Sequence, residues 1–430
     1  MLFLGVFCDW RRSACFPVFR AGACSDFRPG KSAGLIRHVR DQEHFPNRFE
    51  VLAMFKRSKR NRSVVELRTE RLLDGGNIER LEERKMLAGN VTAAINASGD
   101  LVVQGDGESN AIQIEIDSVG NVVIDGLSGT SIDDSGLVGS VVSGDVVINM
   151  RGGDDYVVLG GVAGADSSYR SSVPIEDVRI STGAGNDEAL VGFVYQGLRF
   201  AGDVNINAGS GDDYAAVKYS DVDGSISISG SGGNDILGLG ESLTNEVEIR
   251  GGAGDDEARI VESQTVEQME INLGGGDNLA NVELSAAAGL RISSAGGMDE
   301  VFVDGFDAKN SDVTILTGGK NDQITIDELR DGGDLRVQTA GGDDVVEISD
   351  ATFEQARISS AAGNDDVTTR RSVFGESLFT MGGGNDRLSM FESSAFGEVR
   401  GNGGDDIFVN NSADPLPDVD NVGFEVFAVL

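Results

Sequence analysis

One turn recurs twelve times between residues 150 and 410, and it always ends in Gly-x-Asp or a close variant. From the third copy onward, the copies are 20 to 23 residues apart. A fixed period of this size is typical of proteins built from stacked repeats, in which each unit packs only on its neighbours. The aligned last positions of the twelve turns are Asp155, Asp187, Asp213, Asp235, Asp256, Asn278, Asp299, Asp322, Asp344, Asp365, Asp386 and Asp406.

Apolar residues alternate on both sides of each turn. An apolar residue lies seven positions before every aligned position and another lies two positions after it, in all twelve copies. Ten of the twelve copies are apolar again two residues further on. This alternation is the period-2 pattern of strands with one buried face, whereas a helix needs spacings of three and four. Each unit is therefore predicted to be a strand, a Gly-rich corner, a second strand, and a second turn of variable length.

The corner residues suit a sharp turn between two strands. Eleven copies carry Gly two residues before the aligned position, and Lys320 is the exception. Eleven copies carry Asp or Asn between these two positions, and Met298 is the exception. Gly adopts positive φ without a steric clash, and Asp and Asn bond to nearby backbone amides. The sequence predicts an all-β fold, a parallel β-solenoid of about twelve coils, roughly 55–60 Å long at about 4.8 Å per coil.

The pattern divides the chain into four parts. Residues 1–89 are predicted to be a basic leader with little fixed structure, and residues 90–145 irregular coils that cap the solenoid. Regular repeats follow over 146–412, and an apolar C-terminal tail over 413–430 is expected to lie on the last coil. All three cysteines, Cys8, Cys15 and Cys24, fall in the leader. Either Met1 or Met54 is a candidate start, and the apolar stretch after Met1 is too short for a secretory signal.

The charge of the chain is divided unevenly between the leader and the repeats. Residues 1–90 contain 18 Lys and Arg against 11 Asp and Glu, a balance of +7, and residues 91–430 contain 17 against 60, a balance of −43. An acidic rod attracts cations and repels nucleic acid and anionic membrane surfaces, so we expect no nucleic-acid partner. No stretch approaches the roughly twenty apolar residues of a membrane-spanning helix, so no membrane span is predicted.

Stacking the repeats brings eleven Asp side chains into one column. Two unit charges a few ångströms apart repel by about 1 kcal/mol in water and several-fold more near a protein surface. Protonation, outward splaying of the side chains or bound cations must offset this repulsion. Calcium suits such a site because it takes six to eight oxygens from carboxylates and carbonyls. The candidate calcium ligands are Asp155, Asp187, Asp213, Asp235, Asp256, Asp299, Asp322, Asp344, Asp365, Asp386 and Asp406.

The corner also resembles the RTX, or hemolysin-type, calcium-binding repeat, whose nonapeptide is GGxGxDxUx with U a large apolar residue. Gly251-Gly-Ala-Gly-Asp-Asp-Glu-Ala-Arg259 is similar to this pattern, with a small Ala at U, and partial matches end at Leu237, Leu388 and Phe408. The resemblance implies that the column aspartates and the Gly-loop carbonyls bind calcium between coils. RTX nonapeptides, however, come two per coil, and the first Gly is present here only at Gly230, Gly251 and Gly401. The alternative is an Asp and Asn ladder that forms the corner without metal.

Leu81-Glu-Glu-Arg-Lys-Met-Leu87 resembles the LEPR-XLL segment found near the N-terminus of large bacterial surface and repeat proteins. Glu83 replaces the Pro of that motif and Met86 the first Leu of its closing pair. The resemblance implies an extracellular or cell-surface location. The alternative is a chance amphipathic helical turn.

The sequence thus predicts a secreted or surface-displayed, calcium-binding β-solenoid that acts as a structural or adhesive module. Its expected partners are calcium ions and a cell-surface or matrix polysaccharide or protein. One alternative is a β-helix enzyme acting on acidic polysaccharide, with an insertion at Gly161–Arg170 and the basic pair Arg370-Arg371 as its candidate features. Both His residues, His38 and His44, lie in the leader, so the repeats offer no His-based chemistry. The other alternative is a metal-free spacer rod.

Overall fold

The computed structural model of the chain describes residues 89–117, 120–137, 141–161, 175–192, 198–411, 419–424 and 426–429. The leader with its LEPR-XLL-like segment and both candidate starts lies outside these ranges, and so does the insertion after Gly161. The secondary structure of the described ranges consists of strands and turns without helix. Accordingly, they contain no helix of the length and apolarity that crossing a membrane requires.

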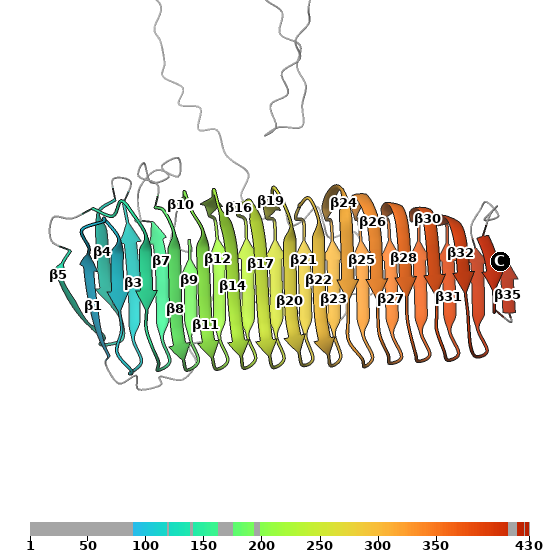
Figure 1. Ribbon diagram of the computed structural model, residues 1–430, viewed down its shortest axis with the longest axis horizontal. Coiled ribbons are helices and arrows are strands. Elements are labelled where there is room, and N and C mark those ends of the chain that lie inside the picture. Colours follow the sequence, from blue (N-terminus) through green and yellow to red (C-terminus); the bar gives the residue numbers. More distant parts are fainter. Residues whose placement is uncertain are drawn as a thin grey trace, which may run out of the picture. The chain divides into compact units, whose positions relative to one another are not determined.

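The strands form two sheets, A and B, that run the length of the solenoid, and a third, sheet C, that is confined to its middle coils (Figure 1). Sheet A has 16 strands: β1 (Asn90–Ile95), β2 (Leu101–Gln104), β5 (Ser131–Gly136), β6 (Val146–Asn149), β8 (Val178–Ala184), β11 (Val204–Ser210), β14 (Ser225–Gly232), β17 (Glu246–Ala253), β20 (Met269–Gly275), β22 (Leu290–Gly296), β24 (Asp307–Leu316), β26 (Arg330–Gln338), β28 (Thr352–Ser359), β30 (Val373–Thr380), β32 (Ser394–Arg400) and β34 (Val419–Val422). Sheet B has 15 strands: β3 (Ala111–Ile116), β4 (Val122–Gly126), β7 (Tyr156–Gly161), β9 (Glu188–Val191), β12 (Tyr214–Lys218), β15 (Ile236–Gly240), β18 (Glu257–Val261), β21 (Leu279–Glu283), β23 (Glu300–Asp304), β25 (Gln323–Asp327), β27 (Val345–Ser349), β29 (Asp366–Arg370), β31 (Arg387–Phe391), β33 (Ile407–Asn411) and β35 (Val426–Val429). Sheet C has four short strands: β10 (Arg199–Phe200), β13 (Asp221–Val222), β16 (Leu243–Thr244) and β19 (Gln264–Thr265).

The predicted parallel β-solenoid is confirmed. Equivalent strands of successive coils pair in parallel, so that Ile206 lies beside Ile180 on one side and Ile228 on the other. Each of the twelve Gly-rich corners directly precedes a strand of sheet B, from β7 to β33. At about 4.8 Å per strand, the sixteen strands of sheet A extend roughly 70 Å.

The two ends of the stack differ in strand direction. At the N-terminal end β1 pairs with β2, and β3 with β4, in antiparallel orientation. At the C-terminal end β34 and β35 continue sheets A and B by pairing in parallel with β32 and β33. Residues of the C-terminal tail therefore lie on the last repeat.

The core is a continuous row of inward-pointing apolar side chains, and the strands that enclose it change along the rod. In the N-terminal half, sheet C closes a third side with small inward residues such as Val222, Thr244 and Thr265. From β24 onward, sheet A strands of seven to ten residues replace these separate short strands, apart from the terminal β34. Phenylalanines fill this half: the rings of Phe353 and Phe374 stack with centroids 6.2 Å apart.

The second turn is more regular than the sequence analysis predicts. In successive coils, the residue six positions after the aligned Asp, or five in one coil, adopts a left-handed backbone with φ between 47° and 83°. These residues are Gly192, Tyr219, Glu241, Glu262, Leu284, Gly305, Glu328, Asp350, Arg371 and Glu392. The position was missed because only two of its ten occupants are Gly. A Ser often follows, and the Ser263 hydroxyl accepts the Ser242 N–H of the preceding coil at 3.3 Å.

Candidate functional site

The eleven predicted calcium ligands lie in one column, but they point into the rod. Each side chain is at most 3% exposed. One oxygen of each accepts a backbone N–H of the preceding coil: the Asp155 N–H donates to Asp187 Oδ1 at 2.7 Å, and the Asp235 N–H to Asp256 Oδ1 at 3.0 Å. At the first position the donor is the N–H of Asn110, 2.7 Å from Asp155 Oδ1. Asn278 takes part equally, since its Oδ1 accepts the Asp256 N–H at 2.9 Å. We call this row of twelve residues the inner column.

The second oxygen of each inner-column Asp is buried and has no hydrogen-bond partner. At Asp256 it lies against Gly251, where a Cβ would approach Oδ2 to 2.3 Å. The same close approach occurs at Gly230 with Asp235 and at Gly401 with Asp406. These three glycines are the first Gly of the RTX-like pattern, and here they make room for a carboxyl group.

Burial raises the pKa of ten inner-column carboxyls. The pKa rises to about 7 at Asp155 and Asp213 and to about 6 at Asp256, Asp322 and Asp386. Desolvation is the largest cause, and the neighbouring carboxyls of the column add to it at these positions. The pKa is also raised, with desolvation as the main cause, at Asp187, Asp235, Asp299, Asp344 and Asp365. These carboxyls therefore keep their protons to a higher pH than exposed carboxyls do.

A second row of Asp and Asn side chains, one position earlier in each corner, runs along the surface. Here the oxygen accepts the N–H of the following coil: the Asp212 N–H donates to Asn186 Oδ1 at 3.1 Å, and the Asp255 N–H to Asn234 Oδ1 at 2.8 Å. Met298 donates its N–H to Asp277 Oδ1 at 2.8 Å but has no oxygen with which to continue the row. Each regular corner is thus tied to both of its neighbours by side-chain bonds of opposite direction.

The corner glycine is required for two reasons. At Gly185 the backbone φ is 135°, and a Cβ would lie 2.0 Å from the carbonyl oxygen of Gly153 in the preceding coil. The other corner glycines share the positive φ, from 102° to 143°. Lys320 holds the same conformation with φ of 142°, which is strained for a residue with a side chain.

We therefore expect Lys320→Gly to stabilise the protein by about 1–2 kcal/mol, because it removes this backbone strain. Urea unfolding followed by circular dichroism measures the effect. Gly319→Ala is the matched control: this neighbour has no positive φ, and its Cβ would make an ordinary 3.6 Å contact with Gly341, so we expect little change. An unchanged or lower midpoint for Lys320→Gly would show that the corner does not require Gly.

The oxygen donors of the corner are already used by the fold. One oxygen of each inner-column carboxyl accepts a backbone N–H, and corner carbonyls do the same, as when the Gly254 N–H donates to the Gly275 oxygen at 3.1 Å. Among the described residues no group of three or more His, Cys, Asp or Glu side chains is placed to hold a metal ion. Calcium needs six to eight oxygens, and one unpartnered oxygen per coil does not supply them in this arrangement. Calcium binding by the inner column stays a prediction.

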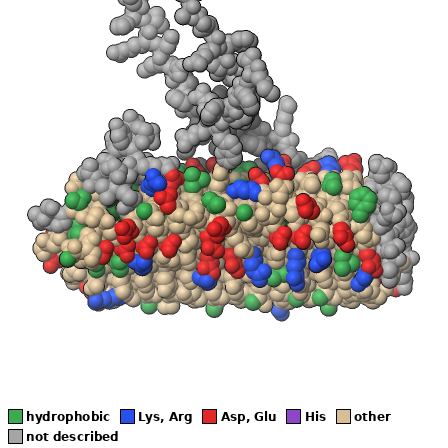
Figure 2. Space-filling view, turned by 45° about the horizontal axis from the view of Figure 1, so that its top comes forward, with side chains coloured by type: hydrophobic (Ala, Val, Ile, Leu, Met, Phe, Trp, Pro, Cys, Tyr) green, Lys and Arg blue, Asp and Glu red, His purple; other side chains and the backbone are tan. Residues whose placement is uncertain are grey.

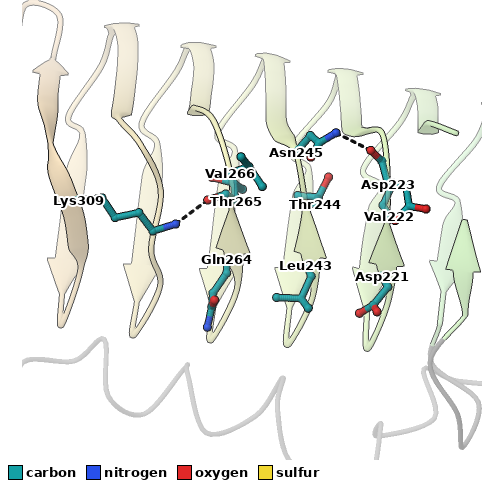
Figure 3. Close-up of a pocket in the computed structure, with 10 residues that line it drawn as sticks. All are labelled: Asp221, Val222, Asp223, Leu243, Thr244, Asn245, Gln264, Thr265, Val266 and Lys309. Atoms are coloured by element: carbon teal, nitrogen blue, oxygen red, sulfur yellow. Dashed lines mark hydrogen bonds between the residues drawn. The ribbon is translucent and has the colours of Figure 1, made fainter. Parts of the chain in front are cut away.

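A shallow groove of about 330 Å³ lies on the outer surface of sheet C (Figure 3). Asp221 and Asp223 line one end and Lys309 of β24 the other, with the exposed side chains of Leu243 and Val266 between them. Lys309 reaches back to donate to the carbonyl oxygen of Thr265 at 2.8 Å. The intervening coil carries only Ala286-Ala-Ala-Gly289 at this side, which explains the depression.

The basic pair Arg370-Arg371, a candidate feature of the enzyme alternative, is divided between two local contacts. Arg371 forms an ion pair with Asp350 at 2.5 Å, and the guanidinium of Arg370 lies 4.8 Å from the ring centroid of Phe391. In the groove, Asp223 forms an ion pair with Arg199 at 3.0 Å. These charged groups are thus already engaged with their own neighbours.

Comparisons with known proteins add no relative: no family model matches the chain, and neither a curated protein nor a solved structure matches it.

Proposed function

We propose that this protein is an elongated structural rod that acts as a spacer or adhesive module outside the cell. The observation that supports this most is the corner itself. Its Asp and Asn side chains, which could have been ligands or catalysts, are used to tie each coil to the next. Stability then increases through repeated neighbour contacts, as in other solenoids. The extracellular location rests on the LEPR-XLL-like segment.

The metal-free form of the rod agrees better with the corner geometry than the calcium-bound form. Asn278 replaces Asp without interrupting the inner column, so the column does not need a charge at every position. Protonation of buried carboxyls supplies the neutralisation that calcium would otherwise provide. Calcium stabilisation in the RTX manner remains the competing form of the same proposal, and a chelator distinguishes the two.

A β-helix enzyme is the second candidate, and the groove on sheet C favours it, since Lys309, Asp221 and Asp223 line one depression. We rank it lower because the Lys309 amine and the Asp223 carboxyl already have partners.

Cell fractionation tests the proposal. Native cells are separated into cytoplasmic, envelope and medium fractions and probed with an antibody raised against the repeats. We expect the protein in the envelope or the medium, and the purified full chain should release no products from acidic polysaccharides. Confinement to the cytoplasm, or steady release of products, would contradict the structural role.

A further inference from the structure

The outer face of sheet A carries two adjacent arginines on a rod that is otherwise strongly acidic. Arg336 of β26 and Arg357 of β28 are direct partners in the parallel register, and both side chains are exposed. They are 21 residues apart in the sequence, so they do not form a run of basic residues. Like charges directly opposite each other across two strands are destabilising, so folding alone does not account for the pair.

Neither arginine is neutralised by an acidic side chain. Arg336 donates to Gln338 Oε1 at 3.0 Å, a neutral partner on its own strand. Arg357 has no ion pair or side-chain hydrogen bond within the described part of the chain. Other arginines of the rod behave differently: Arg179, Arg250 and Arg400, for example, each form an ion pair with an acidic neighbour. Both guanidinium groups therefore keep free donors for a ligand.

In the column of the two arginines the next positions are Thr314 and Leu378, whereas Asp334 and Glu376 lie in the row two residues earlier on the same face. Thr314 precedes Arg336 in the column, and Gln338 and Ser359 form the adjacent row. Arg291 lies one strand beyond Thr314, although Glu270 is 3.4 Å from it. Figure 2 shows basic side chains grouped over the C-terminal half of the visible face, among scattered acidic ones.

We infer that this row on sheet A binds a linear acidic polysaccharide laid along the rod. Neighbouring coils present guanidinium groups about 4.8 Å apart, a spacing that suits a polymer with an anionic group on successive units. Guanidinium groups bind carboxylates through paired, charge-assisted hydrogen bonds, and the hydroxyl and amide groups of Ser359 and Gln338 suit sugar hydroxyls. This inference deepens the proposed adhesive role and rests on it.

Binding of the full chain to immobilised polygalacturonate, in EDTA, tests the inference. The double variant Arg336→Gln/Arg357→Gln should weaken binding by at least about tenfold and reduce its salt dependence. The control Arg199→Gln/Arg330→Gln removes the same charge from arginines that form ion pairs with Asp223 and Glu328, and it should change binding by less than about twofold. Circular dichroism should show both variants folded, since the four side chains are exposed.

Three results would overturn the inference: no binding of the wild-type chain, equal weakening by both double variants, or tighter binding to single-stranded DNA or to phosphatidylserine vesicles than to polygalacturonate. A neutral galactan should not compete with the acidic polymer. Failure of polymer binding would leave the structural rod intact, because that proposal is tested by cell fractionation.

Discussion

The protein should be markedly more stable at pH 5 than at pH 8. Five inner-column carboxyls have pKa values raised from 3.8 to about 6 or 7, and the pKa of five more is raised, so between these values the folded chain binds more protons than the unfolded chain. Stability therefore falls as the pH rises from about 4 to about 7 and changes little above that. The five carboxyls whose pKa reaches about 6 or 7 each contribute on the order of 1–3 kcal/mol, and the other five shift in the same direction.

Urea unfolding between pH 4.5 and pH 8.5 at constant ionic strength measures this dependence. The acidic surface acts in the same direction, because surface carboxylates repel each other more as they ionise, but added salt screens that part. The pH dependence that comes from the buried carboxyls should persist at high salt. A midpoint that is constant or rises with pH would show that the inner column is ionised and stabilised in some other way.

An inner-column Asp both accepts a backbone hydrogen bond and ionises, and replacing it by Asn should separate these two properties. Asn keeps the oxygen that accepts the backbone N–H, as Asn278 does, and cannot ionise. The Nδ2 of Asn278 donates to Gly276 at 3.0 Å and to Ser294 at 3.0 Å. In the coil after Asp322, the hydroxyl of Thr339 occupies the position equivalent to Ser294, which lies in the coil after Asn278. We expect Asp322→Asn to stabilise the protein by roughly 2 kcal/mol at pH 8 and by about half as much at pH 5, because the unfolded chain is already ionised there.

The matched variant Asp322→Ala removes both roles. At pH 5, where the carboxyl is protonated, it should cost about 1–3 kcal/mol because the buried Asp299 N–H loses its acceptor. Equal effects of Asn and Ala at pH 5 would show that the hydrogen bond along the column contributes nothing. Unfolding midpoints of both variants, measured at the two pH values, decide between these outcomes.

The repeat period and the alternation of apolar residues were enough to predict the solenoid and to align the inner column. They did not reveal that the aspartates point inward, because a carboxyl is ordinarily a surface group. The buried position is possible because a backbone N–H of the neighbouring corner donates a hydrogen bond to the carboxyl. Lys320 and Met298 are the two exceptions in the corner pattern. In the structure Lys320 has a strained backbone, and Met298 interrupts the second row of Asp and Asn side chains.

Other features depend on contacts between coils that sequence spacing does not show. Sheet C was not predicted because its strands are two residues long. The groove arises because residues 286–289 have small side chains or none. Arg336 and Arg357 are neighbours only because the strand register pairs them. The regular second turn was hidden because Glu, Asp and Arg occupy a left-handed position that usually indicates Gly.

Thermal unfolding of the full chain in EDTA and in a calcium titration tests the central claim most directly. We predict the same melting temperature in both, because the column oxygens accept backbone N–H groups and burial raises the pKa of the carboxyls. Magnesium at equal ionic strength should match calcium. A large rise in melting temperature with calcium alone, or folding only in its presence, would contradict this prediction and show that the inner column binds calcium.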